Sequence, residues 1–105
     1  MSTVTWPTSD GATHEFSLCE QAGQWNAVAG IYIFAYLTPD GWHALYVGQT
    51  DNFNSRIPTH ERWAEAVALR ATHVHALVVS QAAMRDSLER KLIQDYQPPM
   101  NQQLR

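Results

Sequence analysis

The stretch GIYIFAYLTPDGWHALYVGQT, residues 30–50, contains the clearest structural signal in the sequence. It is rich in β-branched and aromatic residues on both sides of Pro39-Asp40-Gly41, a tripeptide with turn chemistry, so it predicts a β-hairpin. The two ends of the stretch carry the aromatic triplets Gly30-Ile31-Tyr32 and Tyr46-Val47-Gly48. Tyrosine is a common strand residue with an apolar ring, so packing alone is one explanation for both tyrosines.

The segment before this hairpin, TVTWPTSDGATHEFSL at residues 3–18, alternates about Trp6 and Phe16 and has turn-forming residues between them. It predicts an N-terminal hairpin. We expect that hairpin to cover a sheet edge or to form a protein interface, with the two aromatics as anchors. Residues 19–29 have weak periodicity and fit either a short helix or a loop.

The pattern changes to helical spacing after residue 51, where Asp51, Asn52 and Asn54 are candidate caps. Thr59 follows Pro58 and is a candidate N-cap for a longer helix. Residues 72–80, THVHALVVS, predict a third strand. Residues 80–97 predict a second helix, capped by Ser80, whose core stripe recurs every four residues at Met84, Leu88, Leu92 and Tyr96.

The resulting order, β-β-α-β-α after an extra hairpin, predicts an α/β fold of the α+β type. Its small central sheet is largely antiparallel and flanked by helices. A chain of 105 residues with 45% hydrophobic content is expected to form one domain. In that domain, residues 30–105 are the main body and residues 1–29 are an N-terminal extension.

Composition argues against a membrane-spanning, disulfide-linked or zinc-binding protein. No apolar run of eighteen residues is present, and the first residues lack a basic start, so we expect a soluble cytoplasmic protein with no membrane partner. The lone Cys19 predicts no internal disulfide and lacks the paired spacing of a zinc site, which favours a small buried side chain.

The charge distribution is asymmetric. A net charge of −3 argues against a protein that coats nucleic acid by bulk electrostatics. Residues 1–52 hold five acidic residues and no Lys or Arg, whereas residues 53–105 hold all seven basic residues against five acidic ones. An anion site is therefore expected in the second half. A mixed surface that serves only solubility has the same pattern.

Five short pieces between residues 30 and 101 form an ordered series. They are Gly30-Ile31-Tyr32, Tyr46-Val47-Gly48, Arg56 in NFNSRI, Glu89 in SLERKLI and Asn101 in QPPMN. In this order and at these spacings they resemble the GIY-YIG nuclease family, with YVG in place of YIG. Either triplet alone is weak, but five elements in order are specific.

The resemblance implies an endonuclease that hydrolyses DNA phosphodiester bonds with Mg²⁺ or Mn²⁺. Glu89 would hold the cation, since Mg²⁺ is commonly bound by one or two carboxylates plus phosphate oxygens. Arg56 would hold the scissile phosphate through its planar donors. Tyr32 would activate the water and Tyr46 would orient the water or phosphate. His60, one helical turn after Arg56, could take the proton from Tyr32.

Four further residues would support this site. Gly30 and Gly48 would permit close backbone approach. Asn101 would tie the C-terminal loop to the active face, unless it is an ordinary turn residue. Many members of the family carry a lysine where this chain has Gln49, an uncharged donor, so one phosphate contact or assisting cation is expected to be missing.

Other interpretations remain open. Glu89 could form a surface pair with Arg85 at i−4. His73 and His75 share a strand face and could be metal ligands or a partly exposed pair. At the level of function, the alternative is a catalytically weak nucleic-acid-binding or protein-interaction module, and a protein partner or homo-oligomer could supply specificity. If the nuclease hypothesis holds, we expect Tyr32, Tyr46, Arg56, His60 and Glu89 to converge on one face of the sheet.

Overall fold

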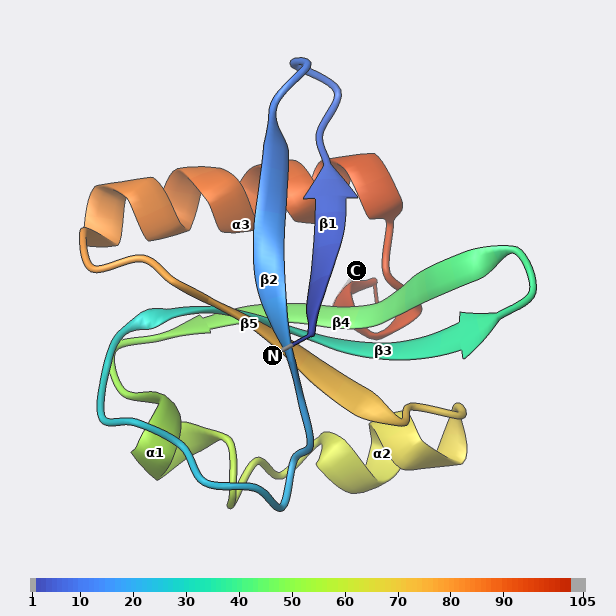
Figure 1. Ribbon diagram of the computed structural model, residues 1–105, viewed down its shortest axis with the longest axis vertical. Coiled ribbons are helices and arrows are strands. Elements are labelled where there is room, and N and C mark those ends of the chain that lie inside the picture. Colours follow the sequence, from blue (N-terminus) through green and yellow to red (C-terminus); the bar gives the residue numbers. More distant parts are fainter. Residues whose placement is uncertain (1, 103–105) are drawn as a thin grey trace.

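The strands form one antiparallel sheet in the computed structural model, which describes residues 2–102. The strand order is β1-β2-β5-β3-β4. The strands are β1 (Thr3–Pro7), β2 (Thr13–Cys19), β3 (Gly30–Thr38), β4 (Gly41–Thr50) and β5 (His73–Val78). The sheet curls so strongly that β1 and β2 run across the direction of β3 and β4 (Figure 1). The predicted α+β class, with an antiparallel sheet and an extra hairpin, is confirmed.

Helices cover both faces of the sheet. They are α1 (Phe53–Arg56), α2 (Trp63–Ala68), α3 (Ala82–Tyr96) and the 3₁₀ turn η1 (Pro99–Asn101). Figure 1 shows α3 on one side of β3, β4 and β5, and α1 with α2 on the other side. None of the helices within residues 2–102 has the length and apolarity needed to span a bilayer.

The helical region after β4 differs from the prediction. Asn52 does cap α1, because its Oδ1 accepts the backbone N–H of Ser55 at 3.2 Å. The prediction of a longer helix from Thr59 is wrong. The chain instead forms two short helices, and the second begins only at Trp63. The break follows Pro58, which has no backbone N–H to offer a helix. It allows His60 to turn inward and become buried.

Helix α3 begins later than predicted. It starts at Ala82, after Gln81, so Ser80 is not its cap. The carbonyl oxygen of Ser80 instead accepts a hydrogen bond from Nη1 of Arg85. The expected core stripe is only partly correct, because Met84 is 58% exposed while Leu92 is fully buried.

Two apolar clusters lie on the two faces of the sheet. The cluster beneath α1 and α2 contains Tyr32, Phe34, Phe53 and Ile57 among others. The cluster beneath α3 contains Ile31, Ile33, Val47 and Leu92 together with Trp6 and Phe16 of the N-terminal hairpin. Alternation along β3 therefore directs Tyr32 toward α1 and α2, and both isoleucines toward α3.

The N-terminal hairpin covers a sheet edge, as predicted. Strand β2 pairs with β5 from Ser17 to Cys19, so the hairpin adds two strands to the sheet. Trp6 and Phe16 are buried in the cluster beneath α3, so they anchor the hairpin as predicted, within the same chain rather than in a protein interface. Cys19 is partly rather than fully buried.

His75 is part of this core. It is fully buried, and its Nδ1 accepts a hydrogen bond of 2.9 Å from Nε1 of Trp6. The interpretation of His73 and His75 as a partly exposed pair is therefore wrong for His75. Neither belongs to a group of metal-ligating residues within the part of the chain that the structure describes.

Candidate active site

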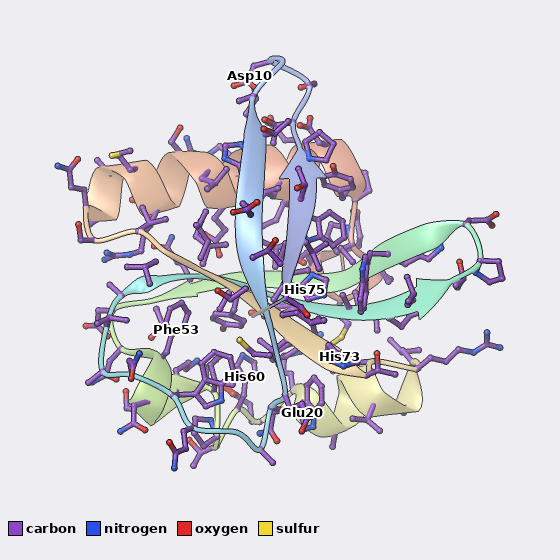
Figure 2. All side chains as sticks on the ribbon, viewed as in Figure 1. Asp10, Glu20, Phe53, His60, His73 and His75 are labelled. Atoms are coloured by element: carbon purple, nitrogen blue, oxygen red, sulfur yellow. The ribbon has the colours of Figure 1, made fainter. Side chains whose placement is uncertain are left out.

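Tyr32 and His60 form the buried centre of the candidate site. The hydroxyl of Tyr32, on β3, lies 2.9 Å from Nε2 of His60, and both side chains are buried. His60 comes from the segment between α1 and α2, on the side of the strands where Phe53 also lies (Figure 2). The expectation that His60 sits in the first turn of a helix is wrong, because α2 begins at Trp63.

The second ring nitrogen of His60 fixes its tautomer. Its Nδ1 accepts the backbone N–H of Arg62 at 3.1 Å, so Nδ1 carries no proton. Burial, assisted by the charge of Arg56, lowers the pKa of His60 to about 4, so the ring is neutral at pH 7. The one proton of the ring is therefore on Nε2, which donates to the hydroxyl oxygen of Tyr32. In this arrangement His60 cannot take the proton from Tyr32, which corrects the role expected from the sequence.

Tyr32 remains protonated at neutral pH in the protein alone. Burial raises the pKa of its hydroxyl well above the ordinary value, and the neighbouring Tyr46 and Glu89 add to this increase. Arg56 acts in the opposite direction, through its positive charge. Ionising Tyr32 therefore requires additional positive charge.

Arg56 is the last residue of α1 and is partly exposed. Its Nη1 contacts both carboxylate oxygens of Glu61, at 2.7 and 3.2 Å. The hydrogen bond from Arg56 lowers the pKa of Glu61 to about 2, so this carboxylate stays ionised. Arg56 thus stands between an exposed carboxylate and the buried Tyr32 hydroxyl, in a position where an anion from solvent can reach it.

The position of the Tyr32 ring requires a residue without a side chain at position 48. The two residues are partners across β3 and β4. A Cβ at Gly48 would lie 2.5 Å from both Cζ and Oη of Tyr32, a distance at which the ring would have to move. The absence of a side chain at Gly48 therefore lets the hydroxyl of Tyr32 lie against the backbone of β4, the outer strand of the sheet.

Tyr46 lies on the same face as Tyr32 and completes an aromatic group around His60. Its ring centroid is 6.2 Å from that of Tyr32 and 5.6 Å from that of His60. The guanidinium of Arg62 lies over the Tyr46 ring, 5.1 Å from its centroid, at the distance of a cation–π contact. Tyr46 therefore helps to enclose the site.

Glu89 approaches from the other face of the sheet. It lies on α3, whereas Tyr32 points toward α1 and α2. The expectation that all five residues share one face is therefore wrong for Glu89, and this outcome counts against the nuclease site in the form that the sequence predicted. Its carboxylate is held at the β4 edge by Nε2 of Gln49 at 2.9 Å, and its charge still acts on Tyr32. The site is consequently built around the edge strand rather than on a single face.

Glu89 does not form the alternative pair with Arg85. The Nη1 atom of Arg85 donates instead to the backbone carbonyls of Val79 and Ser80, each at 3.0 Å. Burial raises the pKa of Glu89, the hydrogen bond from Gln49 lowers it, and the neighbouring Asp86 raises it again. Glu89 is thus a half-buried carboxylate at the edge of the sheet.

Two of the supporting residues shape the strands. Asn101 binds the outer edge of β4 as a strand would: its Oδ1 accepts the N–H of Val47 at 2.8 Å, and its Nδ2 donates to the carbonyl of Val47 at 2.9 Å. The expected tie between the C-terminal loop and this part of the sheet is present. Gly30 leaves room for the ring of Phe53, which would lie 2.5 Å from a Cβ there.

The donor set at Glu89 fits a hard divalent cation with sparse protein ligation. Within residues 2–102 no group of three or more His, Cys, Asp or Glu side chains is arranged to hold a metal ion. Mg²⁺ usually keeps several waters and needs only one or two carboxylates plus phosphate oxygens. Glu89, with the carboxylate of Asp86 one turn earlier on α3, satisfies that smaller requirement.

Sequence reasoning missed three residues of the site: Glu61, Arg62 and Asp86. The signal for the first two was the alternation of charge in THERW, residues 59–63, shortly after Arg56. Asp86 lies three residues before Glu89, the spacing that places two side chains on one face of a helix. Its shared contact with Gln49 had no signal, because it joins β4 to α3.

No protein-family model matches the chain, and no curated protein or solved structure matches it either. The resemblance to the GIY-YIG family therefore remains a hypothesis that rests on the residues themselves.

Proposed function

We propose that the chain is a GIY-YIG-like endonuclease that hydrolyses DNA phosphodiester bonds with Mg²⁺ or Mn²⁺, in the cytoplasm. The observation that carries the proposal is the buried hydroxyl of Tyr32, held by a donor from His60, beside Arg56 and within the field of Glu89. Burying a hydroxyl and an imidazole together is costly unless they have partners or a purpose. Packing alone would be satisfied by phenylalanine at position 32.

The donors around Tyr32 suit a hydroxyl that must ionise during the reaction. His60 donates from Nε2, and Arg56 adds positive charge, so both groups favour the phenolate over the phenol. Because Nε2 carries its own proton, the hydrogen of Tyr32 has to point away from His60, toward a third group such as the attacking water. To act as a base, Tyr32 would first lose this proton to solvent water, and the phenolate would then accept a proton from the attacking water; His60 takes neither proton.

Arg56 would bind the scissile phosphate, since its guanidinium stays charged and offers several donors. An incoming phosphate would share or replace the contact that Glu61 makes with Nη1. Glu89 would hold the cation at the β4 edge. A divalent cation supplies, when bound, stabilisation of the negative charge that develops on the phosphate.

The choice of DNA substrate would depend on a partner as well as on this chain. Seven basic residues give few phosphate contacts for tight binding to DNA by the chain alone. A protein partner or a second copy of the chain would then supply specificity.

One observation favours a second candidate, a catalytically weak nucleic-acid-binding or interaction module. Arg56 and Glu89 already have partners in the protein, Glu61 and Gln49, and Tyr32 is protonated at neutral pH. A domain that had lost catalysis could keep such contacts as structural ones.

The two candidates are separated by a cleavage assay on labelled duplex and branched DNA, with Mg²⁺, with Mn²⁺ or with a chelator. The informative variant is Glu89→Gln, because an amide oxygen can still accept the hydrogen bond from Gln49 while the negative charge is lost. Glu20→Gln, at an exposed position outside the site, is the matched control. Cleavage by the native and control proteins, abolished by chelator and by Glu89→Gln, supports the nuclease. DNA binding without cleavage under every metal condition supports the module.

A further inference from the structure

Gln49 stands where the pattern that the chain resembles often has a lysine, and its amide nitrogen contacts two carboxylates. Its Nε2 donates to Oδ1 of Asp86 at 2.6 Å and to Oε1 of Glu89 at 2.9 Å. Gln49 pairs with Ile31 across β3 and β4, and Ile31 belongs to the cluster beneath α3. The side chain therefore lies on the α3 face, away from Tyr32, so it is not a phosphate donor beside the tyrosine.

We infer that Gln49 is a positioning residue, which holds the Glu89 carboxylate at the β4 edge and leaves its negative charge intact for a divalent cation. This inference rests on the proposed function, because the cation is the one that the nuclease would use. A glutamate has several rotatable bonds, and a fixed hydrogen bond from the sheet removes part of that freedom.

The neighbouring arginine side chains do not orient the Glu89 carboxylate. Arg85 is turned toward the carbonyls of Val79 and Ser80 and is buried there. Arg90 acts on Glu89 through its charge. Within residues 2–102, Arg90 forms no ion pair with the Glu89 carboxylate. The Gln49 amide is therefore the contact that orients Glu89.

The neutrality of the amide matters as much as its position. Two carboxylates share one uncharged donor, so both negative charges remain available to attract a cation. A lysine at position 49 would place an ammonium group between the same two carboxylates and neutralise part of that charge. With glutamine at position 49, the site lacks that positive charge and therefore binds the cation more tightly than it would with lysine.

The test combines two measurements on the full chain: the pKa of the Glu89 carboxyl by ¹³C NMR titration, and the affinity for Mn²⁺ by calorimetry without DNA. The variants are Gln49→Met, which keeps the length of the side chain but removes both donors, and Gln49→Lys, which restores a donor with charge. Gln24→Met and Gln24→Lys, at an exposed loop position, are the matched controls. Gln49→Ala replaces Gln49→Met if the latter does not unfold cooperatively.

We expect a crossed pattern. Gln49→Met should raise the pKa of Glu89, because a donor to the ionised form is lost, whereas Gln49→Lys should lower it. Both variants should weaken Mn²⁺ binding, by roughly 10- to 100-fold as for the loss of a group that orients a metal ligand. The Gln24 variants should change neither quantity.

Two failures can be told apart. Native Mn²⁺ binding that Gln49→Met leaves within a factor of two overturns the role of Gln49 but not the proposed function. A native protein that binds no Mn²⁺, and cuts no DNA with it, overturns the cation site and the proposed function together.

Discussion

The indole N–H of Trp6 donates a hydrogen bond of 2.9 Å to Nδ1 of His75, which joins the N-terminal hairpin to the centre of the sheet. Because Nδ1 is an acceptor, the neutral ring carries its proton on Nε2. That nitrogen is buried and has no hydrogen-bond partner among the described residues. The ring centroids of His75 and Trp42 are 4.4 Å apart, in an edge-to-face arrangement. Figure 2 shows His75 where the hairpin crosses the other strands. The hairpin is therefore part of the core of the fold.

Replacing Trp6 with phenylalanine should destabilise the protein clearly. The variant Trp6→Phe keeps an aromatic ring but leaves Nδ1 of His75 buried without a donor, which costs about 1–3 kcal/mol. Trp25→Phe is the matched control, since Nε1 of Trp25 donates to the carbonyl of Gln21 in a partly exposed loop. Its loss should cost about 1 kcal/mol or less. Urea denaturation measures the unfolding free energy of both variants. Equal decreases would show that the Trp6–His75 hydrogen bond contributes no more stability than the exposed one.

Acid should destabilise the fold over a defined range of pH. Burial lowers the pKa of His75, and likewise that of His60, from about 6.5 to about 4. Between these two values the unfolded chain binds more protons than the folded one, so stability is complete above pH 6.5 and falls as the pH decreases toward 4. Each histidine contributes up to about 3 kcal/mol to this loss, at 1.36 kcal/mol per pKa unit. Unfolding free energies at pH 7, 5.5 and 4 measure the slope, and a flat profile would contradict the burial of neutral rings.

Much of the fold could be predicted because its signals are local. The alternation along β3 and β4, the turn residues between them and the helical spacing of α3 lie within short segments. Pro58 marks the break between α1 and α2 locally, but the delay of α2 to Trp63 could not be predicted, because it accompanies the burial of His60 against Tyr32, 28 residues earlier. The burial of His75 likewise depends on Trp6, 69 residues away in the sequence.

The resemblance named Tyr32, His60 and Glu89 as candidates, but their arrangement was not predicted. The structure places the hydroxyl of Tyr32 against His60 and within the field of Glu89. The face of the sheet that α3 covers is set by its connection to β5 and by packing, for which the sequence has no local signal. The proton on His60 depends on a backbone N–H, that of Arg62, which no side-chain pattern reveals.

Adding one methyl group at Gly48 should damage the site. In Gly48→Ala the new Cβ would lie 2.5 Å from Cζ and Oη of Tyr32, so the ring must move away from its contact with His60. Under the proposed function, DNA cleavage should fall by roughly 10²-fold or more, since small displacements of a reacting group are costly. In the control Gly23→Ala the new Cβ meets only the carbonyl of Glu20, at 3.1 Å, and cleavage should be unaffected. Native cleavage by Gly48→Ala would show that the position of the Tyr32 hydroxyl does not matter.

Removing the hydroxyl of Tyr32 tests the proposed chemistry most directly. Tyr32→Phe preserves the ring but leaves Nε2–H of His60 buried without an acceptor, so stability should fall by about 1–3 kcal/mol. Cleavage per folded molecule should fall by roughly 10²- to 10⁴-fold, the contribution of a lost acid–base group. DNA affinity should change little, because phosphate binding is assigned to Arg56 and the cation. Tyr36→Phe, on the same strand but stacked against His43 outside the site, is the control and should cut DNA normally. If Tyr32→Phe loses stability yet cuts DNA at the native rate once folded, the tyrosine is a structural partner of His60 and the nucleophilic water is activated elsewhere.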